Sequence, residues 1–277
     1  MYKKLILSAL LLYVTPTLHA SELADQPISQ VMSGDLQPPI VNYYEPAKKI
    51  NSEDLTADNI SNFQNAAVVI RLHNKLDEKL ALINQLKTST VYLEFDCEYG
   101  TITKAELESL AQVSNLRGID FFDCGLTDGD MEYLKPLEGL RLLSLTCNEK
   151  ITSNGLQHIS GLTNLIFLSL DGVYVKDEGI KVLLGLTKLK HFDLSETGVR
   201  DASLEVVAGF NDLEVLDVSY NSPDDGQVGG ITDNGLVYLN GLKKLRKLCL
   251  DGNDGITFKG LSEIYIAHPG LETEVSV

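Results

Sequence analysis

The stretch LTNLIFLSLDGVYVKDEGIKVLLG, residues 162–185, carries apolar side chains at intervals that match neither a regular helix nor a regular strand. Its leucines first stand three and then two residues apart, and the later apolar positions stand three and four apart. The first part predicts a short strand that turns Leu168 and Leu170 to one buried face. The second part predicts a short helix that faces the same core through Ile180 and Leu183.

The same pattern recurs along the chain. Full copies begin at Leu116, Leu140, Leu165, Leu189, Leu213 and Leu245, so that successive starts lie 24, 25, 24, 24 and 32 residues apart. A weaker copy begins at Thr90 and a faint one at Ala67, and the sequence ends in a partial copy, LETEVSV, whose register the pattern leaves open. A single copy is weak support for a fold, whereas six at a near-constant period predict a repeat architecture.

These copies resemble the leucine-rich repeat, whose unit reads L-x-x-L-x-L-x-x-N/C-x-L over about 20 to 29 residues. The resemblance covers residues 90–277. Second halves such as VKDEGI, residues 175–180, look like the variety with a true helix in each repeat, which is similar to the cysteine-containing repeats of F-box proteins and to bacterial repeat proteins. No F-box precedes the repeats here. The resemblance implies an α/β fold, a right-handed leucine-rich repeat solenoid with a parallel concave β-sheet and outer helices.

Packing arguments lead to the same architecture. No single turn of chain can enclose its own five or six apolar side chains, so neighbouring turns must bury them, and each fully buried leucine then contributes about 1.5–3 kcal/mol. After each strand the chain turns toward its helix. We expect Asp177, and its equivalents Asp128, Ser153 and Asp233, to cap the helix that follows in the same repeat.

Four segments are predicted. Residues 1–20 have the layout of a secretory signal peptide, with two lysines before an apolar run that is too short to span a bilayer; the alternative is a buried N-terminal helix. Residues 21–50 hold four of the eight prolines and are predicted to form an exposed leader. Residues 51–89 are predicted to form a mainly helical N-terminal cap with an edge strand, and residues 90–277 form the repeats.

The charge of the chain restricts its partners. The formal net charge is −16, and removal of residues 1–20 with their two lysines gives −16 − 2 = −18. Such a surface repels nucleic acid and anionic lipid and favours basic or neutral partners. The predicted signal peptide implies an exported protein, periplasmic or secreted. Because no later segment has transmembrane length, we expect no membrane insertion.

The sequence predicts no enzyme, no cofactor and no metal site. Motifs of nucleophile elbows, phosphate-binding loops and zinc sites are absent from it. The histidines after the signal peptide fall in different repeats or in the cap, without metal-ligand spacing; they are His73, His158, His191 and His268. The insertion NSPDDGQVGG, residues 221–230, is either a solvated loop or a calcium site without the spacing of an EF-hand.

The cysteines follow the repeat. Cys97, Cys124 and Cys147 lie seven or eight residues after their repeat starts, so they stack near one another. They are either small buried residues at the Asn/Cys position of the unit, or two of them form a disulfide across strands ~4.8 Å apart, in a pairing that the sequence leaves open. Cys249 is expected alone on the concave face, and no base is assigned to it.

Side chains on the concave side of the strands are the candidate binding surface. One column of them is apolar and aromatic, and two are acidic and hydroxylated. Seven strands at ~4.8 Å spacing give a surface about 30 Å long, which suits a standard interface of ~800 Å² per partner. Short polar residues also suit a crowded inner curve on which nothing binds. The candidate partner-binding residues are Tyr92, Glu94, Asp120, Phe122, Leu142, Phe167, Asp171, His191, Asp193, Val215, Asp217 and Lys247.

The preferred functional hypothesis is a non-enzymatic scaffold that binds a protein or peptide with basic groups. The apolar column would anchor the partner through Tyr92, Leu142, Phe167 and Val215. The carboxylates of Asp120, Asp193 and Asp217 would pair with its basic groups. His191 either contacts a ligand from its outward position or is an ordinary surface histidine. The resemblance to bacterial repeat proteins implies a secreted bacterial surface protein or effector.

Two other hypotheses belong to different classes. Asp193 and Asp217 are candidates for the paired carboxylates of a glycan-processing enzyme, because two acids at a suitable separation hydrolyse glycosidic bonds. Alternatively, the chain is a structural module that self-associates edge to edge through an open parallel strand near residues 275–277.

Overall fold

The computed structural model describes residues 47–73, 76–95, 97, 101–222 and 230–275. All of them belong to the compact unit Ile40–Val277. The predicted signal peptide, nearly all of the predicted leader and most of the loop at 221–230 lie outside the described residues. No helix in the described ranges is long and apolar enough to cross a bilayer.

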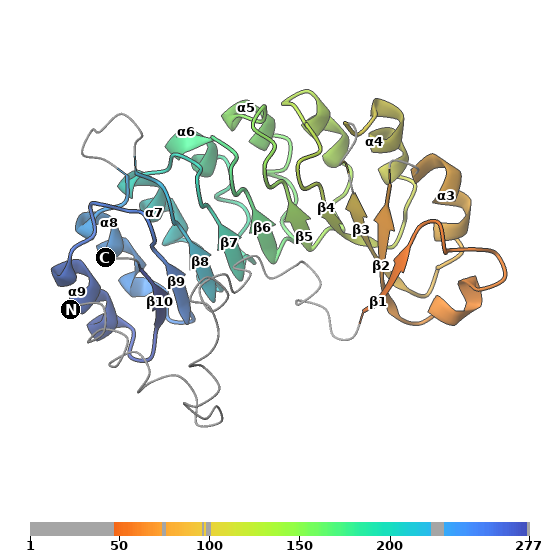
Figure 1. Cartoon of the computed structure of the whole chain (residues 1–277). Coiled ribbons are helices and arrows are strands. Elements are labelled where there is room, and N and C mark those ends of the chain that lie inside the picture. The colour runs from red at the N-terminus through yellow and green to blue at the C-terminus, as the bar shows by residue number, and fades with distance from the viewer. Residues whose placement is uncertain (1–46, 74–75, 96, 98–100, 223–229, 276–277) are drawn as a thin grey trace, which may run out of the picture. The chain divides into compact units, whose positions relative to one another are not determined.

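The described strands form one parallel sheet in which each strand pairs with its neighbours in the sequence (Figure 1). A parallel ladder in chain order is the arrangement that stacked repeats require, because each repeat contributes one strand beside the last. The strands are β1 (Lys48–Asn51), β2 (Ala67–Leu72), β3 (Thr90–Phe95), β4 (Leu116–Asp120), β5 (Leu142–Ser144), β6 (Phe167–Ser169), β7 (His191–Asp193), β8 (Val215–Asp217), β9 (Lys247–Cys249) and β10 (Glu272–Glu274).

Short helices connect the strands and line one side of the sheet (Figure 1). The opposite side of the sheet, which the helices do not cover, is called the strand face below. The repeat that begins at Leu116 has a 3₁₀ helix where the sequence predicts an α-helix. The helices are η2 (Ile60–Phe63), α3 (Leu76–Ile83), α4 (Lys104–Leu110), η3 (Asp130–Leu134), α5 (Ser153–Leu156), α6 (Lys176–Lys181), α7 (Asp201–Val207), α8 (Asp233–Leu236), η4 (Val237–Gly241) and α9 (Phe258–Ala267).

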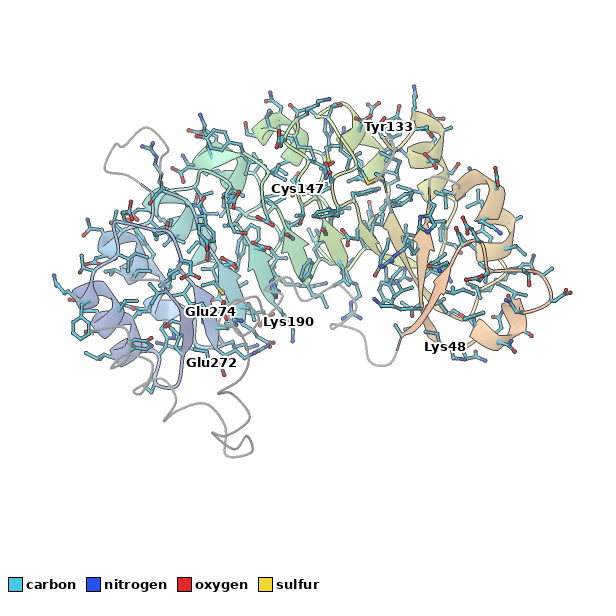
Figure 2. The ribbon with its side chains drawn as sticks, in the orientation of Figure 1. Lys48, Tyr133, Cys147, Lys190, Glu272 and Glu274 are labelled. Atoms are coloured by element: carbon cyan, nitrogen blue, oxygen red, sulfur yellow. A yellow bond between two sulfur atoms is a disulfide. The ribbon has the colours of Figure 1, made fainter. Side chains whose placement is uncertain are left out.

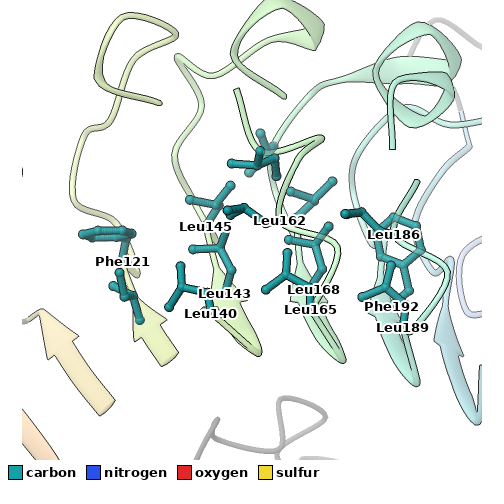
Figure 3. Close-up of a cluster of buried hydrophobic side chains, with 14 of the residues drawn as sticks. Phe121, Leu140, Leu143, Leu145, Leu162, Leu165, Leu168, Leu186, Leu189 and Phe192 are labelled. Carbon is teal, nitrogen blue, oxygen red and sulfur yellow. The ribbon is translucent and has the colours of Figure 1, made fainter. Parts of the chain in front are cut away.

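The predicted inward positions of the strands form a continuous core between sheet and helices. Leu143 pairs with Leu168, which pairs with Phe192, which in turn pairs with Leu216. All four side chains are fully buried. Figure 3 shows how core side chains of successive repeats stack in columns, with Phe192 in the column of Leu143 and Leu168 and Phe121 at the level of Leu145. The prediction of a leucine-rich repeat solenoid is confirmed by this shared parallel ladder.

The two ends of the sheet refine the predicted boundaries. β1 begins at Lys48, inside the segment predicted as leader, and pairs with β2, so β1 and not β2 is the first strand of the sheet among the described residues. The faint copy at Ala67 is a true strand of the ladder. At the other end, Glu272 pairs with Lys247, which fixes the register of the final partial copy and makes β10 the last strand among the described residues.

The prediction of helix caps within a repeat is wrong for Asp177 and its equivalents. Asp177 accepts hydrogen bonds from the backbone N–H of Arg200 and the hydroxyl of Ser203, which lie at the next helix along. The local cap, where one exists, is a threonine such as Thr152, which accepts from the N–H of Asn154. We call the aspartates that reach forward in this way the helix-side column; they are Asp128, Asp177, Asp201 and Asp233.

In three of the four receiving helices a glycine makes room for the carboxylate, and in α7 Ser203 stands there and donates to Asp177. A Cβ atom on Gly235 would collide with the carboxylate of Asp201, and one on Gly260 would collide with that of Asp233. The carboxylate therefore approaches the helix backbone where any other residue would place its side chain. This contact accounts for Gly155, Gly235 and Gly260, whereas Gly179 of α6 packs against Val175 and Leu156.

Of the two alternatives for the cysteines, the structure has the disulfide. Cys97 and Cys124 are bonded, with their Cα atoms 5.2 Å apart. Cys147 is a free, half-buried thiol. Beside it, Asn148 takes the Asn/Cys position of the unit and donates to the carbonyls of Phe121 and Leu145. The disulfide thus joins the repeat that starts at Leu116 to the one before it.

Candidate functional site

The acidic and hydroxyl-bearing residues of the strand face lie side by side. Asp120 pairs with Ser144, Ser144 with Ser169, Ser169 with Asp193, and Asp193 with Asp217 in the parallel register. Neighbouring strands in such a sheet are about 4.8 Å apart, so these side chains are close neighbours. We call Asp120, Asp193 and Asp217 the strand-face column.

Serine and threonine hydroxyls connect this column into a hydrogen-bonded chain. Ser169 Oγ donates to Asp193 Oδ2 at 3.0 Å and lies 2.9 Å from Thr146 Oγ1. Ser195 donates to Asp193 Oδ1 through both its hydroxyl, at 2.6 Å, and its backbone N–H, at 3.1 Å. The backbone N–H of Ser219 donates to Asp217 Oδ1 at 2.9 Å. The donors are neutral, so they orient the carboxyl groups without neutralising them.

Burial changes the acidity of these carboxyl groups. Asp193 and Asp217 are 6% and 8% exposed. Removal from water, with the neighbouring charge of Asp217 as the second cause, raises the pKa of Asp193 to about 7. Burial likewise raises the pKa of Asp217 and that of the half-buried Asp120. In the described part of the chain, no lysine or arginine forms an ion pair with any of the three.

The apolar column of the strand face is buried rather than open. Tyr92, Leu142 and Phe167 are 0–6% exposed and form, with Val69, a second apolar cluster on the opposite side of the sheet from the main core. Ile166 is half-buried and packs against this cluster. Burial raises the pKa of Tyr92 to about 12, against the opposing charges of two arginines. The strand alternation predicts an open position for these side chains, which is wrong, and their role as anchors stays a prediction.

His191 is buried and neutral. Its ring lies 4.8 Å from that of Phe167, centroid to centroid, and 5% of the residue is exposed. Burial, helped by the charges of Lys247 and Arg246, lowers the pKa of His191 to about 4. The alternative of an ordinary surface histidine is therefore wrong. At neutral pH its imidazole adds no positive charge beside the carboxyl groups of β7 and β8.

The other candidate residues of the strand face differ in exposure. Phe122 is 50% exposed, whereas Val215 is buried and only 7% exposed. Glu94 receives ion pairs from Arg71 and Lys49, at 3.4 and 3.8 Å. The remaining two candidates, Asp171 and Lys247, are half-buried; Asp171 accepts from Ser195 Oγ, and Lys247 pairs with Glu274 at 2.7 Å.

The site offers weak support for catalysis. Cys249 is buried, and burial together with Asp217 and Glu274 strongly raises the pKa of its thiol, which disfavours a thiolate nucleophile. The raised pKa of Asp193 has the direction that a general acid needs, yet Asp193 and Asp217 are both more than nine-tenths buried. Within the described residues, no three His, Cys, Asp or Glu side chains gather as metal ligands.

The serines and threonines of the network are not among the predicted site residues. The repeat pattern predicts outward positions for Ser144, Ser169 and Ser195 without a role. The repeat spacing does carry the signal, because each lies at the same offset as an aspartate of a neighbouring repeat. Alternation of acid and hydroxyl at one offset is the pattern that would have identified the network.

Comparisons with known proteins bear on the fold only. No protein-family model matches the chain, and no curated protein matches it. The crystal structure of an internalin, InlF, from Listeria monocytogenes aligns with a TM-score of 0.48 and 19% identity over 76% of this chain and 59% of that chain. The crystal structure of a TLR13–ssRNA13 complex aligns with a TM-score of 0.47 and 17% identity.

The TLR13 alignment covers 83% of this chain. The chain spans 59% of the length of the internalin and 36% of the length of TLR13. At this similarity the alignments carry no information about partners. The ten described strands in chain order, with leucines repeated in one register, define the chain as a leucine-rich repeat solenoid.

Proposed function

We propose that the chain is an exported, non-enzymatic scaffold that binds a protein or peptide partner with basic groups on its strand face. The observation that carries the proposal is the strand-face column, three aspartates in register without an ion pair to any described lysine or arginine. Buried carboxyl groups are stable as charges only when they are paired. A basic side chain of the partner supplies the missing charge.

A partner of this kind meets the rim of the face first. Phe122 is half exposed and offers an aromatic contact beside the half-buried Asp120. Asp251 lies two residues after β9, and its buried Oδ1 has no hydrogen-bond partner among the described residues. A donor from the partner satisfies such an oxygen, and an unsatisfied buried acceptor costs about 1–3 kcal/mol.

Binding of a basic group should release a proton from Asp193. The carboxyl group holds that proton up to about pH 7 because it is buried next to Asp217. A cation nearby favours the ionised form and lowers the pKa. The affinity for a basic partner is therefore expected to rise as the pH rises through 7.

The test uses fluorescence anisotropy with two labelled peptides, one of alternating lysine and serine and one of alternating glutamate and serine. The protein should bind the lysine peptide more tightly, and Asp120→Asn with Asp217→Asn should weaken that binding about tenfold, the loss of one charge-assisted contact. The control, Asp58→Asn with Asp254→Asn, removes the same charge from two exposed sites elsewhere. Equal binding of both peptides, or an equal loss in the control, contradicts the proposal.

Export rests on residues 1–20, which lie outside the described residues. Expression of the full chain in a bacterial host, followed by N-terminal sequencing of the protein from the periplasm and medium, tests it. A new N-terminus near Ser21 supports export, and an intact Met1 in the cytoplasm opposes it.

Edge-to-edge association is a second candidate. β10 is the last described strand and has a neighbour on one side only. Phe258 and Ile266 of α9, which precedes β10, are 86% and 79% exposed. Sedimentation velocity over a range of concentrations tests it: the sedimentation coefficient should rise with concentration and stay constant in Phe258→Glu with Ile266→Glu.

A further inference from the structure

A pocket opens at the edge of the sheet where β4, β5 and β6 begin. Its volume is about 410 Å³, and it is lined by Arg117, Gly139, Arg141, Asn164, Ile166 and Lys188. Pockets of about 300 Å³ and above are large enough for small ligands. The lining contains three cationic side chains and no acidic one, in a protein whose formal net charge is −16. We call this the basic pocket.

Two of the three cations of the basic pocket, Arg117 and Lys188, donate to neutral acceptors. Arg117 Nη1 donates to the carbonyl of Leu116 at 2.7 Å. Lys188 Nζ donates to Asn164 Oδ1 at 2.7 Å, and Asn164 Nδ2 donates in turn to the carbonyl of Glu138. Over the described part of the chain, no carboxylate lies within ion-pair distance of Arg117, Arg141 or Lys188.

The same edge is neutralised further along the solenoid. Lys190 pairs with Glu214 at 2.9 Å, Arg246 pairs with the same Glu214 at 3.6 Å, and Lys244 pairs with Asp212 at 2.6 Å. Figure 2 labels Lys190 at this lower end of the strands. Arg246 stands one residue after its repeat start, as Arg141 does, and Lys244 stands one residue before its start, as Lys188 does. Unpaired positive charge is therefore a property of the pocket rather than of these repeat positions.

The shape of the pocket also depends on a glycine. A Cβ atom on Gly139 would lie 2.8 Å from Arg117 Nη1 and 3.5 Å from its Cζ. Any other residue at 139 would displace the guanidinium group. Ile166 lines the inner side and is shared with the apolar cluster of Tyr92, Leu142 and Phe167. The pocket thus joins a cationic outer part to an apolar inner wall.

We infer that the basic pocket binds the phosphate or sulfate group of a small ligand. Two guanidinium groups and an ammonium group match a dianionic tetrahedral oxyanion, because guanidinium forks bind such oxygens in pairs and the ammonium adds a point charge. A phosphate monoester carries about −1.5 to −2 charges at neutral pH. A long polyanion is disfavoured, since the net charge of the chain repels it outside the pocket.

Isothermal titration calorimetry at low ionic strength, with the full chain and three probes, tests the inference. The probes are inorganic phosphate, inorganic sulfate and acetate. Phosphate or sulfate should bind, and acetate, a monoanion of similar size, should bind at least about tenfold more weakly. The member of the pair that binds more tightly assigns the ligand class. Absence of binding by both oxyanions, or acetate binding of equal strength, overturns the inference.

The repeat supplies a matched pair of variants. Arg141→Gln with Lys188→Gln removes two unpaired cations, and Arg246→Gln with Lys244→Gln removes the same residue types at the same repeat positions where they are paired. The first pair should weaken oxyanion binding at least about tenfold and the second less than about twofold. Equal weakening in both means a general charge effect and overturns the inference. All four side chains are exposed, and thermal unfolding verifies that both variants are folded.

Discussion

Two columns of aspartates run along this solenoid at equivalent positions of the repeats, and the pKa values of their carboxyl groups shift in opposite directions. The helix-side column, represented by Asp233, accepts from backbone and hydroxyl donors of the next repeat, at 2.8 and 2.6 Å from Thr257. The strand-face column, represented by Asp193, lies between serines and a second carboxyl group. The pKa of Asp233 is lowered and that of Asp193 is raised.

The difference shows that the donors around an aspartate, and its burial, decide whether the carboxylate stabilises the fold. Backbone N–H groups at a helix start have no intrahelical acceptor, so a carboxylate that reaches them satisfies donors that must be satisfied. Asp193 and Asp217 each accept one backbone N–H as well, from Ser195 and Ser219, but these donors belong to their own repeat and the two carboxyl groups are buried beside each other. The helix-side column therefore joins successive repeats, whereas the burial of the strand-face carboxyl groups beside one another disfavours their ionised form and costs stability at neutral pH.

The largest expected effect is the loss of a helix-side carboxylate. In the wild type, the backbone N–H and the hydroxyl of Thr232 donate to the Asp201 carboxylate at 2.8 and 2.7 Å. Asp201→Ala leaves both donors without this acceptor. Urea unfolding at pH 7 should show a free energy of unfolding lower by about 3 kcal/mol. Glu205→Ala, on the exposed side of the same helix, is the control and should change it by less than about 0.5 kcal/mol. A loss below about 1 kcal/mol for Asp201→Ala would mean that the column is not structural.

A slightly smaller effect is expected from the glycine that receives this carboxylate. Gly235→Ala places a Cβ atom against the Asp201 carboxylate and should lower the free energy of unfolding by about 2 kcal/mol. Gly241→Ala is the control, because a Cβ there meets no atom within 4 Å. In the Asp201→Ala background the cost of Gly235→Ala should nearly vanish. If it persists unchanged, the glycine is needed for another reason.

The architecture was predictable from the sequence because it depends on local periodicity. Leu168 and Leu170 reveal their buried face through the period of two, and the recurrence near 24 residues reveals the stacking. The hydrogen bonds from Asp177 to the next repeat were not predictable in this way. They depend on the distance between stacked repeats, which the residue spacing within one helix does not reveal. A threonine directly before four of the α-helices was the available signal for the true local cap.

The strand face was predicted in composition but not in exposure. Alternation places Tyr92 and Phe167 on that face, but it does not say whether they are open, and they are buried in a second cluster. The basic pocket was not predictable from strand alternation, because its cations stand next to the repeat starts and not at the outward strand positions. Positions next to the start bring Arg117 and Arg141 together with Lys188, a grouping visible only once the strands are aligned.

The strand-face column should respond to pH in a direction that marks it as unpaired. The folded state binds the proton of Asp193 more tightly than the unfolded chain, whose aspartates titrate near 3.8, so this group lowers stability as the pH rises from about 4 to about 7. Asp193→Asn carries no charge at any pH. Its free energy of unfolding should exceed that of the wild type by on the order of 2 kcal/mol at pH 8 and match it near pH 4.

Chemical denaturation at pH 4, 6 and 8 measures this, with the exposed Asp254→Asn as the control that removes a charge without a burial term. A stabilisation that is independent of pH would mean that Asn packs better than Asp for steric reasons. A destabilisation at pH 8 would mean that the Asp193 charge is already paired in the folded chain.

The smallest effect is expected at Asp233, where the contribution to stability changes with pH in the direction opposite to that of Asp193. Burial raises the pKa of this carboxyl group, but the hydrogen bonds from Thr257 and Gly260 and the charge of Lys259 outweigh it, so the pKa lies below 3.8. Its contribution is complete above pH 3.8 and is lost as the pH falls through the folded pKa. Asp233→Asn should therefore be less stable than the wild type at pH 7 and approach it in stronger acid. If Asp193→Asn and Asp233→Asn shift with pH in the same direction, the two columns do not differ in the way that their contacts require.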